Sequence, residues 1–261
     1  MKISCLQMNM MLGCPNGNFA HAKQLIQEAM KEKPDVLVLP ETWNTGFIPQ
    51  EDLSKLSDRD GQRTKEEIGA LANAYHVNIV AGSVSNLRQD RIFNTSMVFN
   101  KQGECVASYD KIHLFSPMGE DRNFARGDHI SLFSLDGMRC GVIVCYDLRF
   151  PELTRKMAVQ GLDVLFVVSQ WPKVRRRHLQ ALAVARAIEN QMYVVCCNSC
   201  GVAGKTIFGG GSMVVDPMGM VLAQAGEKEE ILLCDISGDC LVQIRDQIPV
   251  FRDRIPELYA E

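Results

Sequence analysis

The sequence lacks the long apolar runs that would place it in or across a membrane. None of its apolar stretches approaches the roughly 20 residues that a transmembrane helix needs. The first ten residues, MKISCLQMNM, also lack the apolar region and small-residue cleavage site of a secretory signal peptide. We therefore expect a cytoplasmic protein with no membrane partner.

A strong excess of one charge is also missing. The chain carries 28 Lys and Arg against 31 Asp and Glu, a formal net charge of −3, so nothing attracts the whole molecule to nucleic acid. Its one basic cluster, WPKVRRRH over residues 171–178, has three successive arginines without interleaved aromatic residues. A small-molecule partner therefore fits this composition better than a nucleic acid.

Metal-site and disulfide patterns are sparse, although the chain has ten cysteines. Cys197 and Cys200 form a CxxC, with no second CxxC and no nearby His. Most of the other cysteines lie inside strand-like runs, and the chain is far larger than disulfide-rich secreted domains. This usage favours reduced, buried thiols, and we expect no metal site.

What the sequence does contain is an alternation of helices and strands. Hydrophobic periodicity predicts strands at 3–10, 36–40, 77–85, 91–100, 105–111, 131–137, 141–147, 163–169, 192–198, 212–216, 220–226 and 230–237, and helices at 19–30, 65–75, 152–159 and 178–188. Interior strands flanked by helices, with consecutive strands at the ends of each half, indicate an α/β protein with mixed sheets. No Pro-, Gly- or Ser-rich linker interrupts residues 1–261, so we expect a single domain.

Three reactive side chains occupy the same kind of position, at the end of an apolar strand. Cys145 closes GVIVC, Glu41 follows VLVLP, and Lys111 closes CVASYDK. The carboxyl ends of strands are where ligands gather in α/β sheets, and a helix N-terminus after Cys145 would favour its thiolate. A thiol that attacks an amide needs a base, a group that stabilises the oxyanion and an acid for the departing ammonia. Together the three residues supply these functions.

The motifs around these residues, LPETW, YDKIHLF and VCYDLRFPE, resemble those of the nitrilase (carbon–nitrogen hydrolase) superfamily in order and spacing. The resemblance covers nearly the whole chain. It implies a four-layer αββα sandwich with mixed sheets, and catalytic roles for Glu41, Lys111 and Cys145. It also implies support from Glu120 and from the backbone N–H of Tyr146 as an oxyanion donor. Members pair across a two-fold axis, so we expect a homodimer, with the C-terminal tail of about residues 239–261 at its interface.

The segments SQWP, ARAIENQMYV and QIRDQIPVFRDRIPELY resemble the branch of the superfamily that hydrolyses ω-amides of dicarboxylic acids. On that reading, Trp171 forms a wall of the pocket, and Arg175 or Arg149 holds the distant carboxylate by a bidentate contact. Two simpler roles stay open: Arg149 pairs with Glu152 to brace the turn after the strand, and Arg175 serves a dimer contact.

The resemblance therefore implies a thiol amidase that needs no metal or organic cofactor and acts on 2-oxoglutaramate-like ω-amides through a thioester. The alternatives within the superfamily are an N-carbamoyl or a deaminated-glutathione amidase. An alternative of another class is a non-catalytic binding module in which the thiol and the acid are idle. His113, two residues after Lys111, also leaves open a Cys–His pairing with Cys145.

Overall fold

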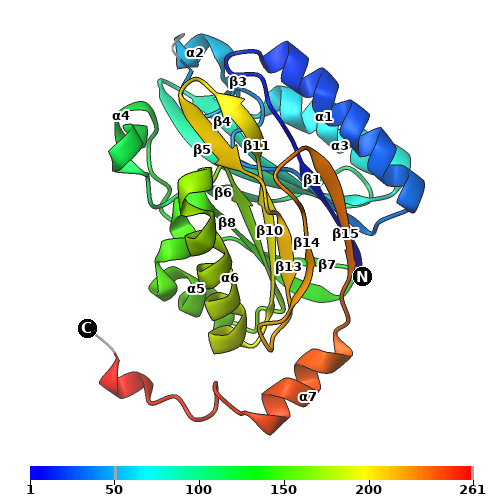
Figure 1. The fold of residues 1–261 in the computed structure, drawn as a ribbon, viewed down its shortest axis with the longest axis vertical. Helices are drawn as coiled ribbons and strands as arrows, with labels where there is room; N and C mark the ends of the chain where they lie inside the picture. Colours follow the sequence, from blue (N-terminus) through cyan, green and yellow to red (C-terminus); the bar gives the residue numbers. More distant parts are fainter. Residues whose placement is uncertain (50–51, 260–261) are drawn as a thin grey trace.

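The computed structural model describes residues 1–49 and 52–259, and its core is a pair of mixed β-sheets (Figure 1). The seven-stranded sheet has the order β15-β1-β2-β4-β5-β6, with β3 paired to β4, and the six-stranded sheet has the order β14-β13-β10-β9-β8-β7. The first comprises β1 (Lys2–Gln7), β2 (Val36–Val38), β3 (Asp58–Arg59), β4 (Asn78–Arg88), β5 (Arg91–Phe99), β6 (Cys105–Asp110) and β15 (Glu230–Asp235). The second comprises β7 (Leu132–Leu135), β8 (Met138–Val144), β9 (Val164–Ser169), β10 (Tyr193–Asn198), β13 (Met213–Val215) and β14 (Val221–Gln224).

The strands at the centre of each sheet are parallel. β1, β2 and β4 run parallel in the first sheet, as do β8, β9 and β10 in the second. The outer strands pair antiparallel, except for the short β3, which is parallel to β4. The carboxyl ends of the central strands therefore lie at one edge of each sheet, where reactive groups that follow them meet. The prediction of mixed sheets is confirmed.

The molecule has four layers, α, β, β and α. One apolar core lies between the sheets, a second lies under α1 (Pro15–Ala29) and α3 (Gln62–Tyr75), and a third lies under α5 (Pro151–Ala158) and α6 (Arg176–Asn190). Alternation along β8 illustrates the cause: Val142 and Val144 enter the core between the sheets, and Ile143 enters the core under the helices. Because both faces of the strand are covered, its sequence is continuously apolar. The four-layer prediction is confirmed.

Element boundaries differ from the sequence prediction in a few places. The first strand ends at Gln7 rather than at residue 10, where its pairing with β15 stops. The hairpin of β11 (Cys200–Ala203) and β12 (Thr206–Gly209) was not predicted, nor were the short helices α2 (Leu53–Leu56) and α4 (Glu120–Asn123). None of the described helices is long and apolar enough to span a bilayer.

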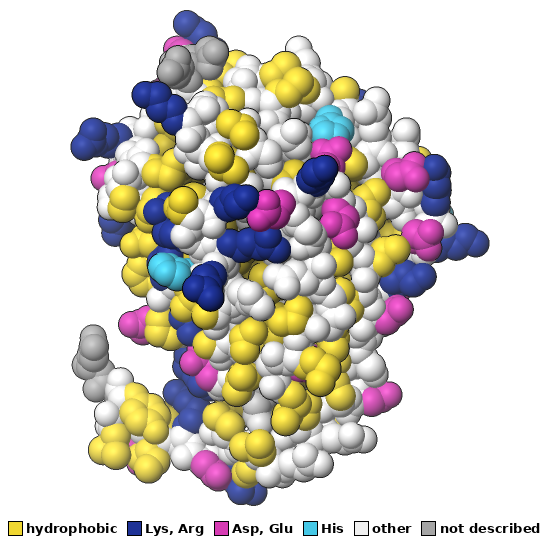
Figure 2. All heavy atoms as spheres, in the orientation of Figure 1, with side chains coloured by type: hydrophobic (Ala, Val, Ile, Leu, Met, Phe, Trp, Pro, Cys, Tyr) yellow, Lys and Arg dark blue, Asp and Glu magenta, His cyan; other side chains and the backbone are white. Residues whose placement is uncertain are grey.

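The C-terminal tail contains a helix, α7 (Asp239–Gln247), that the sequence analysis did not predict. Leu241 of α7 packs into the core between the sheets, and Arg245 forms an ion pair of 2.9 Å with Asp163. Beyond α7 the chain carries exposed apolar side chains at Leu258 and Tyr259. Figure 2 shows apolar side chains gathered at this end, standing away from the body of the molecule.

Candidate active site

One pocket collects the side chains that follow the carboxyl ends of the strands. Glu41 comes three residues after β2, Lys111 directly after β6, Cys145 directly after β8, and Gln170 directly after β9. The pocket is lined by Glu41, Phe47, Lys111, Phe115, Met118, Cys145, Tyr146, Arg149, Gln170, Trp171, Pro172 and Arg175. It therefore brings together seven of the eight residues expected from the sequence. The eighth, Glu120, lies directly behind the lining, against Lys111.

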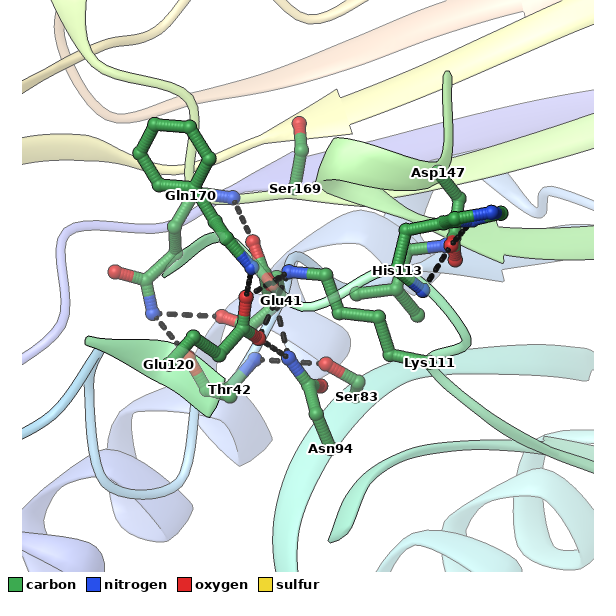
Figure 3. A network of polar contacts seen from close by, with 12 residues as sticks. Glu41, Thr42, Ser83, Asn94, Lys111, His113, Glu120, Asp147, Ser169 and Gln170 are labelled. Carbon is green, nitrogen blue, oxygen red and sulfur yellow. Dashed lines mark hydrogen bonds and ion pairs between the residues drawn. The ribbon is translucent and has the colours of Figure 1, made fainter. Parts of the chain in front are cut away.

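Lys111 is held between two carboxylates at the base of the pocket (Figure 3). Its Nζ lies 2.8 Å from Glu41 Oε1 and 2.8 Å from each carboxylate oxygen of Glu120, and all three side chains are fully buried. An ammonium has three N–H donors, and three carboxylate oxygens, two of them on Glu120, lie within hydrogen-bond distance of Nζ. The cluster thus holds a cation in place beside Cys145.

Burial and charge oppose each other in this cluster. Burial lowers the pKa of Lys111, but the charges of Glu41 and Glu120 outweigh it and raise that pKa above its usual range. Burial raises the pKa of Glu120, with Glu41 adding to the shift and Lys111 opposing it. Lys111 is therefore charged throughout the physiological range, and it suits electrostatic stabilisation better than proton transfer.

Two residues that the sequence analysis missed hold Glu41. Asn94 Nδ2 on β5 donates to Glu41 Oε1 at 2.9 Å and to Glu120 Oε1 at 3.0 Å, and the backbone N–H of Gln170 donates to Glu41 Oε2 at 2.7 Å. Gln170 Nε2 also donates to the Glu41 carbonyl at 2.8 Å. Asn94 is one of several polar residues in the predicted strand 91–100, so the sequence alone did not single it out.

The turn that carries Cys145 is held by another missed residue, Asp147. Cys145 has φ of 48°, a left-handed conformation that residues with a side chain adopt only when their surroundings enforce it. The buried Asp147 carboxylate accepts from Val144 N at 3.0 Å, Tyr109 Oη at 2.8 Å and His113 N at 2.9 Å. These bonds join the end of β8 to β6 and the segment after it.

The helix N-terminus that the sequence analysis expected directly after Cys145 is absent, and the need for a base that it also predicted remains. A short 3-10 turn, Cys145–Arg149 (η3), follows the strand, and α5 begins only at Pro151, so no α-helix N-terminus supports the sulfur directly. Burial and the charge of Glu41 raise the pKa of Cys145 well above its ordinary value, although Lys111 opposes them. The thiol is therefore protonated at rest, and attack needs a base at the moment of reaction.

His113 is engaged elsewhere, which bears on the Cys–His alternative. Its Nδ1 lies 2.8 Å from Asp147 Oδ1, and its ring stacks on Phe150 with 3.6 Å between centroids. Figure 3 shows His113 and Asp147 turned toward each other, away from the Glu41 cluster. His113 does not line the pocket, and this geometry favours Glu41 as the base beside Cys145.

The outer part of the pocket combines aromatic walls with two arginines. Trp171 is buried, and its Nε1 donates to the Arg175 carbonyl at 2.8 Å. The Arg149 guanidinium lies over the Trp171 ring at 4.7 Å, and that of Arg175 lies over Phe115 at 5.2 Å. Within residues 1–49 and 52–259 neither guanidinium forms an ion pair with a carboxylate, so the pairing of Arg149 with Glu152 considered above is not observed.

The remaining sequence candidates are structural. All ten cysteines are free thiols. Cys197 Sγ contacts the Val38 carbonyl at 3.2 Å and Cys200 Sγ contacts the Gln7 carbonyl at 3.8 Å, both buried between elements. In the described part of the chain, no group of three or more His, Cys, Asp or Glu residues is arranged to hold a metal ion.

Comparisons with known proteins agree with this geometry. A family profile described as "Carbon-nitrogen hydrolase" matches residues 2–245. The chain is 39% identical over 257 residues to "2-oxoglutaramate amidase" of Bacillus subtilis, covering 98% of each chain. It is 31% identical over 256 residues to "Omega-amidase NIT2" of Homo sapiens, covering 93% of this chain and 91% of the other. The crystal structure of Saccharomyces cerevisiae Nit3, described as a member of branch 10 of the nitrilase superfamily, matches with a TM-score of 0.89 and 29% identity, covering 96% and 94% of the two chains. This chain belongs to the carbon-nitrogen hydrolase family.

Proposed function

We propose that this protein is a thiol amidase that hydrolyses the ω-amide of a small dicarboxylic acid, such as 2-oxoglutaramate, to the acid and ammonia. The observation that carries the proposal is the buried Glu41–Lys111–Glu120 cluster beside Cys145, in one pocket with two arginines. The activities for which the relatives from Bacillus subtilis and Homo sapiens are named support the same substrate class.

The reaction runs through a thioester. Cys145 Sγ attacks the amide carbon while Glu41 takes the thiol proton, and Lys111 Nζ with the Tyr146 backbone N–H stabilises the oxyanion. The tetrahedral intermediate collapses by breaking its C–N bond, and Glu41 returns the proton to the nitrogen, which leaves as ammonia. Glu41 then takes a proton from water as the water attacks the thioester. The C–S bond breaks, and the proton passes from Glu41 to the sulfur.

Glu120 positions Lys111 in this scheme. Both of its oxygens contact Nζ, and Oε2 also accepts from Phe115 N at 2.6 Å, so the carboxylate is fixed to the pocket wall. Every step is a proton transfer or an addition or elimination at a carbonyl carbon. The scheme therefore needs no metal or organic cofactor.

Substrate choice rests on the outer pocket. Trp171 forms a wall against the carbon chain, and Arg149 or Arg175 receives the carboxylate at the far end of the substrate, since each guanidinium lines the pocket without a carboxylate partner among the described residues. A guanidinium that lines the pocket favours an anionic amide over a neutral one.

We also propose that the chain, a single domain over residues 1–261, works in the cytoplasm as a homodimer. Apolar side chains exposed beyond α7, at Ile255, Leu258 and Tyr259, support a role for the C-terminal tail at the interface. Such side chains lose exposed apolar area when a partner covers them.

The test is ammonia release from a panel of compounds, with Cys145→Ala as the blank. The panel holds 2-oxoglutaramate, succinamate, glutamine, N-carbamoyl-β-alanine, deaminated glutathione and a neutral amide. Preferred turnover of the dicarboxylate ω-amides, abolished in the variant, is expected. If only the N-carbamoyl compound or deaminated glutathione is turned over, the thioester mechanism stands and the proposed ω-amide substrate is wrong. If no compound is turned over, the alternative of a non-catalytic binding module is favoured. Burying the three charged side chains of Glu41, Lys111 and Glu120 costs free energy, which argues against their having no role.

A further inference from the structure

Asn94 touches every member of the buried charge cluster. Its side-chain nitrogen donates to Glu41 Oε1 at 2.9 Å and to Glu120 Oε1 at 3.0 Å, and its backbone carbonyl accepts from Lys111 N at 2.9 Å. The same two oxygens also accept from Lys111 Nζ. Two nitrogen donors and two carboxylate oxygens therefore form a closed ring at the base of the pocket (Figure 3).

The Asn94 amide is chemically suited to this ring. An amide nitrogen offers two N–H donors, one for each carboxylate, without adding charge. A second ammonium at this place would neutralise the base, whereas a third carboxylate would repel the other two. Asn94 is fully buried in β5, so its orientation is set by the sheet and not by solvent.

The ring also leaves Glu41 available to the thiol. A carboxylate has about four acceptor positions, and on Glu41 three are occupied: two on Oε1, by Lys111 and Asn94, and one on Oε2, by Gln170 N. Among the described residues, no other backbone or side-chain N–H or O–H donates to the remaining position on Oε2, which can therefore receive a proton. Without the Asn94 donor, the ionised form of Glu41 loses one of its stabilising hydrogen bonds.

We propose that Asn94 is a positioning residue that holds the Glu41 carboxylate in orientation as the base for Cys145 while it separates Glu41 from Glu120. The inference rests on the proposed roles of Glu41, Lys111 and Cys145. Hydrogen bonds to a carboxylate favour its charged form, so their loss raises the pKa of the carboxyl. Because Glu41 acts as a base only when deprotonated, activity that depends on it then begins at higher pH.

The experiment compares the pH dependence of wild type, Asn94→Ala and Asn94→Ser. In Asn94→Ala we expect kcat to fall about 10- to 100-fold at neutral pH, with little change in KM. The acid limb of kcat should move up by about one pH unit. Asn94→Ser keeps one hydroxyl donor, so its kcat and the position of its acid limb should lie between those of wild type and Asn94→Ala. It is also the variant to use if the alanine variant does not fold.

Asn86→Ala is the matched control. Asn86 is a buried asparagine on the neighbouring strand β4, where it donates to Thr95 Oγ1 at 3.2 Å and makes no bond to the carboxylates. Its truncation should lower stability and leave the acid limb in place. If Asn94→Ala lowers activity equally at every pH, as a merely structural change would, the proposal is wrong.

A second readout needs no substrate. The rate at which iodoacetamide alkylates Cys145, located by peptide mass spectrometry, is measured across the same pH range. The acid limb of this rate should move upward in Asn94→Ala and not in Asn86→Ala, and an unchanged limb would overturn the proposal. If wild type hydrolyses none of the amides, the proposed function fails, but the alkylation profile still decides the role of Asn94.

Discussion

Replacing Asp147 by Asn tests whether the turn at Cys145 is held by a buried charge. The carboxylate accepts Val144 N and Tyr109 Oη on one oxygen, and His113 N and Nδ1 on the other. In the variant an NH₂ group replaces one of these oxygens. Whichever oxygen is replaced, a backbone N–H, of Val144 or of His113, then faces another N–H.

The structure sets the size of the effect. Each hydrogen bond to a buried charge contributes about 1.5–3 kcal/mol, and a donor left unsatisfied costs roughly 1–3 kcal/mol more. Asp147→Asn should therefore lower the free energy of unfolding by about 3–5 kcal/mol. For a chain of this size that corresponds to a fall in Tm of roughly 10 °C. The strained backbone of Cys145 should also relax, so kcat should fall with the stability.

Differential scanning calorimetry and ammonia release measure the two effects. Asp163→Asn is the control, because Asp163 accepts Arg139 N at 3.0 Å and pairs with Arg245 but has a side chain that is 22% exposed. Because solvent screens this partly exposed pair, Asp163→Asn should lower the free energy of unfolding by about 1 kcal/mol or less. A Tm for Asp147→Asn no lower than that of the control, with wild-type kcat, would refute the role given to Asp147.

Three further predictions concern the thiol, the arginines and the tail. Glu41→Gln removes a negative charge that contributes to the raised pKa of Cys145, while Lys111 stays positive, so the pKa of Cys145 should fall. Thiolate absorbance at 240 nm, referenced to Cys145→Ala, measures this pKa. An unchanged or higher pKa contradicts the prediction. If Arg149 holds the carboxylate, Arg149→Met should lower kcat/KM for 2-oxoglutaramate about 10- to 100-fold but leave a neutral amide nearly unaffected. Equal losses on both substrates would instead indicate a bracing role, and Arg175→Met distinguishes the two arginines. Truncation after residue 247 should shift sedimentation from dimer toward monomer, and a wild-type chain that is already monomeric would remove the dimer proposal.

The strand ends could be found from sequence because they are local features. Each of Glu41, Lys111 and Cys145 lies at the end of a strand-like run. The predicted strand ends at 40, 111 and 147 nevertheless fall one to three residues past the observed ends at Val38, Asp110 and Val144. Their convergence follows from the rule that ligands gather at the carboxyl ends of parallel strands. The four-layer arrangement, in contrast, came from the family resemblance, because periodicity does not say how two sheets face each other.

The residues that hold these groups could not be found in the same way. Asn94 reaches Glu41 across 53 positions of the chain, and Gln170 reaches it across 129, so their roles depend on strand order and register. The sequence analysis expected a helix N-terminus after Cys145 to favour its thiolate, but burial and the nearby Glu41 raise the pKa of Cys145 instead. These two effects arise only when the sheets are packed.

The central claim is that Cys145 forms a covalent acyl-enzyme, and trapping that species tests it most directly. Wild type is mixed with 2-oxoglutaramate, quenched in acid during turnover, digested and analysed by mass spectrometry. The account predicts an added acyl group on the peptide that carries Cys145, absent from Cys145→Ala and removed by hydroxylamine as a thioester is. Ammonia release with no adduct on Cys145, or turnover retained in Cys145→Ala, would contradict it.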